Sequence, residues 1–254
     1  MDGFSAFVKY YDRLVGADYK KIISFIEKTL KKYKPDSALV ADLGCGSGNV
    51  AIGLVKCGFD LIALDSSAEM LTLAQQKQIG QNISPKKLLL LCQDMCSFEL
   101  YGTVDAIYST LDSINYITDE KQLDHCFKLV NNYLNYGGLF LFDINSFYKY
   151  SKVLNNNIFT YDFDDIYCIW ENMFDKKSRI SNFSLTFFEK EGKLFKRSDN
   201  LQCQKYYALS TIKKLLNKNS LEVLGVWDDY SALPPSRTTQ RYTILARTIK
   251  QPGS

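Results

Sequence analysis

One carboxylate and three glycines form the strongest chemical signal in this sequence. Asp42 follows the apolar run 38–40, and glycines occupy positions Gly44, Gly46 and Gly48. A strand that runs into such a turn and then into a helix lets backbone N–H groups approach a ligand closely. The spacing D-x-G-x-G-x-G differs from the G-x-G-x-x-G of dinucleotide sites, where a pyrophosphate rests on the helix N-terminus. A carboxylate at this place would repel a pyrophosphate and would suit a ligand that carries an ammonium group.

A second acid follows at the interval that a β-α-β unit imposes. Asp65 ends the apolar run 59–64, about 20 residues past the glycine turn, where a doubly wound fold places its ribose-binding acid. The next segment, Ser66 to Glu69, has the S-x-x-E form of a capping box. It therefore predicts the start of a helix over residues 70–78.

Two later apolar runs also lead into polar segments. The run 88–92 precedes the pair 94–95, and the run 104–109 precedes the segment 111–116. With the glycine turn and the second acid, these segments resemble in type and order the cofactor motifs of the class I S-adenosylmethionine-dependent methyltransferases. The resemblance implies S-adenosylmethionine as the cofactor.

The resemblance also implies a role for each motif. The backbone of the glycine turn would pass beside the methionine part, with Asp42 near its ammonium group. Asp65 would accept both ribose hydroxyls, and Asp94 would accept the adenine amino group; the alternative for both is a cap of the local backbone. The implied cofactor-binding residues are Tyr11, Asp42, Gly44, Cys45, Gly46, Asp65, Ser66, Met70, Asp94, Met95 and Leu111.

Residues after the fourth expected strand would face the methyl acceptor. Asp112 could orient an amine or accept its proton, or only cap a helix start, and Tyr116 is the second catalytic candidate. Asn115 and Tyr116 are placed at the carboxyl ends of the strands, where such sheets bind ligands. Arg237 and Arg241 flank the last turn and could hold a substrate carboxylate, or make surface contacts only. No general base is assigned.

Composition and charge narrow the classes of function. The 254 residues carry 31 Lys and Arg against 28 Asp and Glu, and a net charge of +3 is too small to argue for nucleic acid as a partner. No apolar stretch approaches the ~20 residues that span a bilayer, and the N-terminus lacks the features of a signal peptide. Seven cysteines without regular spacing, and a single His, indicate a reducing compartment and no metal site. We therefore expect a cytoplasmic protein.

Alternating apolar and helical patterns predict an α/β fold: a Rossmann-like, seven-stranded, mostly parallel sheet with helices on both faces, plus a small antiparallel β insertion. Residues 4–34 have helical spacing, with Pro35 as the stop. Residues 119–136 form another expected helix, which Gly137 and Gly138 would cap. Strands of the main sheet are expected at 38–43, 60–65, 87–92, 104–109, 138–143, 221–228 and 240–248, and a further helix at 209–219.

Between residues 147 and 206 the chain becomes rich in aromatic residues with strand-like alternation. Three antiparallel strands are expected there, at 165–174, 179–190 and 193–206. Residues 1–146 and 207–249 would form the cofactor-binding core, and residues 147–206 a lid over the acceptor. This insertion resembles the extra sheet of small-molecule methyltransferases, among them the amino-sugar N,N-dimethyltransferases.

These features favour a methyltransferase that acts on a small molecule, at nitrogen in preference to oxygen. The segment 111–114 does not match the N-P-P-Y-like motif of base amino methylation, and no cysteine for carbon methylation of cytosine lies between Asp105 and Tyr116. An RNA or protein methyltransferase and a catalytically silent cofactor-binding protein are the alternatives. A nucleotide-dependent oxidoreductase is disfavoured because G-x-G-x-x-G is missing. We expect a monomer or a homodimer.

Overall fold

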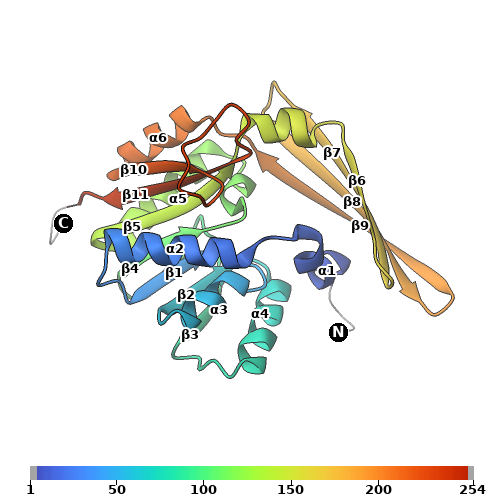
Figure 1. Ribbon diagram of the computed structural model, residues 1–254, viewed down its shortest axis with the longest axis horizontal. Coiled ribbons are helices and arrows are strands. Elements are labelled where there is room, and N and C mark those ends of the chain that lie inside the picture. The colour runs from blue at the N-terminus through green and yellow to red at the C-terminus, as the bar shows by residue number, and fades with distance from the viewer. Residues whose placement is uncertain (1–4, 251–254) are drawn as a thin grey trace.

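Two β-sheets form the framework of the part of the chain that the computed structural model describes, residues 5–250 (Figure 1). The strands of the larger sheet are β1 (Leu39–Leu43), β2 (Asp60–Asp65), β3 (Leu88–Cys92), β4 (Val104–Ser109), β5 (Leu134–Asn145), β10 (Leu221–Asp228) and β11 (Arg241–Thr248). Their order is β10-β11-β5-β4-β1-β2-β3. Only β11 is reversed, running antiparallel to both β5 and β10. The predicted seven-stranded, mostly parallel sheet is confirmed.

Helices cover both faces of this sheet, as predicted. They are α2 (Tyr19–Tyr33), α3 (Asn49–Lys56), α4 (Ala68–Gly80), α5 (Glu120–Tyr133) and α6 (Leu209–Lys218). Apolar residues of α2 and α3 pack with Val40 on one face, and those of α5 and α6 pack with Ala41 on the other. Val40 and Ala41 are neighbours in β1 and point to opposite faces because side chains alternate along a strand. Figure 1 shows α2 crossing in front of the sheet.

The smaller sheet, here called the lid sheet, is antiparallel and extends away from the larger one (Figure 1). Its strands are β6 (Ile158–Asp162), β7 (Ile166–Asp175), β8 (Ile180–Glu191) and β9 (Leu194–Lys205). A short π-helical segment, η2 (Lys149–Leu154), leads from β5 toward it. The antiparallel insertion is confirmed, but β6 was not among the three expected strands. The division of the chain into a core and a lid domain stays a prediction.

The N-terminal helical region is two helices. The first, α1 (Ala6–Val15), is capped at its C-terminal end by Gly16, which has a left-handed φ of 54° that favours glycine. Asp18 then caps α2 by accepting a hydrogen bond from the backbone N–H of Lys21 at 3.0 Å. The expectation of continuous helical spacing over 4–34 is wrong at this joint, and Phe4 lies outside the described residues. The break lets α1 pack against the lid sheet while α2 packs against the larger sheet.

Two predicted caps also differ from the structure. The capping residue of α4 is Ser67, whose hydroxyl accepts from the N–H of Met70 at 3.2 Å, so the helix starts at Ala68. Helix α5 ends at Tyr133, and Gly137 and Gly138 lie inside β5, where a Cβ on Gly138 would meet the Asn135 carbonyl at 2.8 Å. Gly138 therefore serves a close backbone approach within the strand, whereas Gly137 has a left-handed φ of 67° that favours glycine. Within residues 5–250, no helix is long and apolar enough to cross a membrane.

Candidate active site

A cavity of about 480 Å³ opens where β1, β2 and β3 end, and we call it the glycine-turn cavity. A volume of this size is typical of small-molecule and cofactor sites. The predicted cofactor residues that line it are Tyr11, Gly44, Gly46, Asp65, Ser66, Met70, Asp94 and Met95. Sequence reasoning missed Phe7 of α1 and Asn200 and Gln202 of β9, which also line it. No motif marks these positions, because they reach the cavity only through the packing of α1 and the lid sheet.

The glycine turn is held in place by β2. The backbone N–H groups of Gly44 and Cys45 donate to the Leu64 carbonyl at 2.8 and 3.0 Å. Gly44 has a φ of 76°, and a Cβ there would lie 2.9 Å from the Ser113 hydroxyl, so only glycine fits this wall of the cavity.

Asp65, at the end of β2, binds the turn through its side chain. Its carboxylate accepts from the backbone N–H of Gly46 and from that of Ser67, both at 2.8 Å. Partial burial raises the pKa of this carboxyl despite the two hydrogen bonds. Each carboxylate oxygen can accept a further hydrogen bond, so Asp65 keeps acceptor capacity toward the cavity.

Three other predicted cofactor residues, Asp42, Cys45 and Leu111, do not line this cavity. Asp42 is buried beneath the turn, where its Oδ2 accepts from the Tyr108 hydroxyl at 2.9 Å. Its Oδ1 is buried with no hydrogen-bond partner among the described residues. Burial raises the pKa of Asp42 to about 8. A cationic group bound near the turn would stabilise the charged carboxylate.

A second cavity, of about 250 Å³, lies beneath the lid sheet, and we call it the lid cavity. Its wall on the side of the lid sheet is largely apolar and includes Trp170, Phe183 and Leu185. It shares four lining residues with the glycine-turn cavity: Phe7, Tyr11, Tyr116 and Gln202. The two cavities therefore meet at these side chains, and Tyr11 and Tyr116 stand at the junction. Burial raises the pKa of both tyrosine hydroxyls, which stay protonated at neutral pH.

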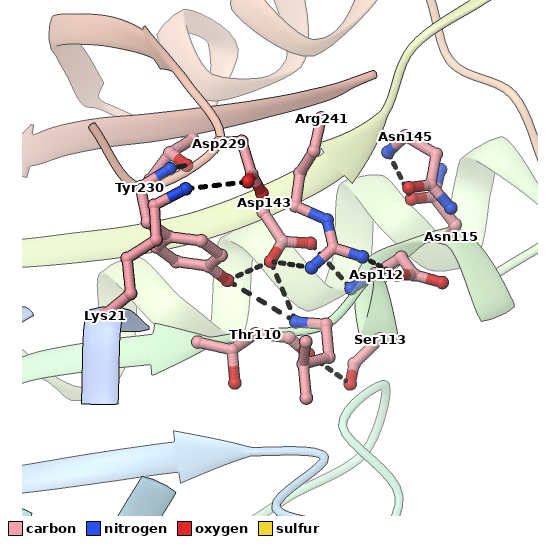
Figure 2. Close-up of polar contacts among 12 residues, drawn as sticks. Lys21, Thr110, Asp112, Ser113, Asn115, Asp143, Asn145, Asp229, Tyr230 and Arg241 are labelled. Carbon is pink, nitrogen blue, oxygen red and sulfur yellow. Dashed lines mark hydrogen bonds and ion pairs between the residues drawn. The ribbon is translucent and has the colours of Figure 1, made fainter. Parts of the chain in front are cut away.

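The polar end of the lid cavity is built on an ion pair (Figure 2). Asp112 accepts from the Arg241 guanidinium at 2.5 Å and from the Gln204 amide at 2.7 Å. Arg241 also lies 3.8 Å from Asp143, a fully buried carboxylate at the end of β5. Tyr230 donates its hydroxyl to Asp143. Each oxygen of Asp112 thus accepts one hydrogen bond, and the Arg241 charge is shared between two carboxylates.

This network holds a strained turn. Leu111 and Asp112 have φ values of 56° and 58°, which cost free energy in residues other than glycine. Their backbone N–H groups donate to the Asp143 carboxylate at 2.8 and 2.6 Å (Figure 2). Asp143 therefore sets the shape of the wall between β4 and the lid cavity. Sequence reasoning missed it, although it ends an expected strand at the edge where ligands bind.

Of the other residues predicted to contact the acceptor, two line the lid cavity and two do not. Arg241 and Tyr116 line the lid cavity. Asn115 is buried, donating to the Lys205 carbonyl at 2.8 Å and accepting from the Asn145 N–H at 2.9 Å, and lines neither cavity. Arg237 is exposed on the loop before β11 and lines neither cavity.

Comparison with known proteins assigns the family. Residues 40–138 match the family described as methyltransferase domain. A protein of Geobacillus sp. (strain WCH70) named as a methyltransferase is 31% identical over 248 residues, covering 96% of this chain and 99% of that protein. The crystal structure of an S-adenosylmethionine-dependent methyltransferase from Clostridium acetobutylicum ATCC 824 is 36% identical, with a TM-score of 0.87 over 95% of this chain and 97% of that one. The chain belongs to the class I S-adenosylmethionine-dependent methyltransferases.

The methyltransferase fold extends to a more distant structure. CalS10, described as an amino pentose methyltransferase from Micromonospora echinaspora, was solved with S-adenosylmethionine bound. It is 14% identical to this chain, with a TM-score of 0.76 over 98% of this chain and 99% of CalS10. At this identity the likeness shows a shared fold.

The glycine-turn cavity of this methyltransferase fits S-adenosylmethionine. The cofactor carries an ammonium group, and the Asp42 carboxyl lies buried behind the glycine turn, outside the lining of the cavity, with an oxygen that has no partner among the described residues. It carries ribose hydroxyls, which suit the acceptor capacity of Asp65. When bound, it supplies a methyl group already activated on a sulfonium. The individual residue roles stay predictions.

Proposed function

We propose that this methyltransferase transfers its methyl group to a small-molecule acceptor bound in the lid cavity. One observation carries the proposal: the lid cavity and the glycine-turn cavity meet at Tyr11 and Tyr116. An acceptor in one cavity would face a cofactor in the other across these side chains. Holding two reactants in line lowers a reaction barrier by about 7–11 kcal/mol. Positioning alone would therefore account for much of the rate enhancement of such an enzyme.

The size and lining of the lid cavity favour a small molecule over a macromolecule. A space of about 250 Å³ beneath the lid sheet leaves room for a compact group and not for a strand of nucleic acid. The net charge of +3 gives no support to a polyanionic partner. CalS10, which shares the fold, is described as acting on an amino pentose, a small molecule. A cytoplasmic location and a monomeric or homodimeric state stay predictions.

The junction favours nitrogen over oxygen as the atom that receives the methyl group. A hydroxyl acceptor needs a base to remove its proton before it attacks, whereas a neutral amine attacks with its own lone pair. Tyr11 and Tyr116 are held protonated, and both oxygens of Asp112 accept hydrogen bonds. Neither tyrosine hydroxyl is ionised at neutral pH, and a neutral amine needs no base for its attack.

Calorimetry and a product assay test this proposal together. The protein is titrated with S-adenosylmethionine and, separately, with NADH; we expect micromolar binding of the sulfonium alone. It is then incubated with the cofactor and paired small amines and alcohols of the same carbon skeleton, with an RNA pool as the alternative acceptor. Methylated amine detected by mass spectrometry supports the proposal. Methylation of RNA alone, or binding of NADH in place of the sulfonium, would overturn it.

A further inference from the structure

Lys149 belongs to the part of the lid-cavity wall that the glycine-turn cavity does not share. It is the first residue of η2 and lines the lid cavity but not the glycine-turn cavity. A third cavity, of about 560 Å³, meets the lid cavity at Lys149, Arg241, Leu111 and Val15. An acceptor that presents its nucleophile at Tyr11 and Tyr116 could therefore place another of its groups at Lys149.

The Lys149 ammonium group has donors to spare. Its Nζ donates to the Asn145 side-chain oxygen at 2.8 Å and lies 4.0 Å from Asp112. Asp112 is engaged more closely by Arg241 and Gln204. An ammonium group carries three donors, so this arrangement leaves two of them without a partner at hydrogen-bond distance among residues 5–250.

The acceptors beside Lys149 each hold at least one donor already. Asn145 accepts from Lys149, and Asp112 accepts from Arg241 and Gln204. A ligand that brings an acceptor to Lys149 would therefore satisfy its remaining N–H groups.

The rest of the lid cavity is suited to an apolar body. Trp170 packs edge-on against Phe159 and Phe183, with ring centroids 6.4 and 5.9 Å apart. Leu14 of α1 and Leu185 of β8 complete this wall. Aromatic side chains arranged in this way bury flat or aliphatic groups effectively.

We propose that the methyl acceptor carries an anionic group, a carboxylate or a phosphate, which binds Lys149, and an apolar body that lies against Trp170 and Phe183. This inference rests on the proposed function, because it names the class of acceptor for the same cavity. It differs from the sequence expectation that Arg241 holds the acceptor's carboxylate. Arg241 is paired closely with Asp112, at 2.5 Å, and also lies 3.8 Å from Asp143, whereas the one ion pair of Lys149 among residues 5–250 is 4.0 Å long.

The electrostatic surroundings agree with this assignment. Burial lowers the pKa of Lys149, and the neighbouring Arg241 lowers it further. The carboxylates that act against this are Asp112, Asp143 and Asp229. They do not restore the ordinary value, so an anion beside Lys149 would stabilise its charged form.

Binding of matched probes tests the inference. The protein, saturated with S-adenosylhomocysteine, is titrated with 3-phenylpropionate, with phenyl phosphate and with the neutral 3-phenylpropionamide. We expect at least one anion to bind about tenfold to a hundredfold more tightly than the amide, as hydrogen bonds to charged groups do. Whichever of the two anions binds more tightly indicates whether the acceptor carries a carboxylate or a phosphate. Lys149→Met should abolish the preference, and Lys149→Arg should keep it.

Lys152 provides the matched control, because it lies on the same π-helical segment and is exposed. Lys152→Met should leave the preference for anions unchanged. Should Lys149→Met fail to fold, Lys149→Gln, which keeps a polar side chain but removes the charge, is the second variant. It should also lose the preference for the anions over the amide.

Two results would overturn the inference: equal affinity for anions and amide, or an anion preference that survives loss of the Lys149 charge. These are distinct from failure of the proposed function. Methylation of neutral amines without any preference for anions would leave the function standing and remove the inference. A clear anion preference without methylation of any small molecule would leave the anion site at Lys149 standing and remove the proposed function.

Discussion

At the scale of single residues, Asp65 has two tasks that can be separated. Its carboxylate accepts from the N–H groups of Gly46 and Ser67, and it faces the glycine-turn cavity. Asp65→Ala should weaken S-adenosylmethionine binding at least about tenfold, since a charged hydrogen-bond acceptor is lost. It should also lower the free energy of unfolding by about 1 kcal/mol, because two backbone donors lose their partner.

Calorimetry and urea unfolding measure these two effects. Asp60→Ala is the control, since Asp60 starts the same strand and makes only an exposed ion pair with Lys87. Asp60→Ala should leave both the cofactor affinity and the free energy of unfolding nearly unchanged. Cofactor affinity that is unaltered in Asp65→Ala would remove the ribose assignment and leave only the capping role.

Arg241 gives a second prediction at this scale, about stability. Its side chain is 14% exposed and bridges Asp112 and the fully buried Asp143. Arg241→Met leaves buried charge without a counter-charge and should cost about 3–5 kcal/mol of unfolding free energy. The double variant Arg241→Met with Asp112→Asn also removes the Asp112 charge. Its loss of unfolding free energy should therefore be smaller than the sum of the losses in the two single variants. Additive costs in urea unfolding would contradict the coupling.

Sequence reasoning placed some site residues well and others poorly, for physical reasons. Asp65 and Gly44 sit at fixed distances from a strand end, so their spacing alone brings them to the cavity. Asn115 follows a strand too, but the backbone turns at Leu111 and Asp112 and sends it into the interior. Lys149 comes from an insertion whose position depends on packing. No local sequence pattern encodes where this insertion packs.

At the scale of elements, patterns predicted strands better than their breaks. The long apolar runs of the main sheet were placed to within a few residues. β6 was missed because only alternate residues of this short strand are partly buried. The joint between α1 and α2 was missed because both helices are amphipathic, and one glycine between them decides the direction of the chain.

The lid sheet yields a prediction about turnover. Trp170 of β7 faces the lid cavity, so Trp170→Ala would loosen the acceptor while leaving the glycine-turn cavity intact. We expect kcat/KM for the acceptor to fall at least about tenfold, as small misplacements of reactants do, with cofactor affinity nearly unchanged. Met173→Ala is the control on the same strand, because Met173 is 61% exposed. Equal effects of the two changes in steady-state kinetics would argue against an acceptor in the lid cavity.

At the scale of the whole molecule, α1 joins the two sheets. Its apolar residues Tyr10 and Leu14 belong to the hydrophobic cluster of the lid sheet. Its Asp12 accepts from the Ser47 hydroxyl at 2.6 Å and pairs with Lys77 at 2.5 Å, and these two residues lie in the glycine turn after β1 and in α4. The position of the lid sheet, and so the junction of the two cavities, depends on this helix.

The pH dependence of stability offers a final prediction, through Asp42. Its pKa is raised to about 8 by burial, from an ordinary value near 4. Below pH ~4 the carboxyl is protonated in both the folded and the unfolded state. Between about pH 4 and 8 the unfolded chain loses this proton while the folded protein keeps it, so this group lowers the free energy of unfolding by up to about 1.4 kcal/mol per pH unit. Above pH 8 its contribution is constant.

Asp42→Asn removes this titration and keeps an acceptor for the Tyr108 hydroxyl. Urea unfolding of both proteins at a series of pH values should therefore show the variant gaining stability relative to the original as pH rises from about 4 to 8. Other carboxylates titrate equally in both proteins, so the difference isolates Asp42. Saturating S-adenosylmethionine should reduce the difference, because a bound ammonium near the turn stabilises the charged carboxylate and lowers its pKa. A difference that does not vary with pH would mean that Asp42 is charged in the folded protein throughout this range.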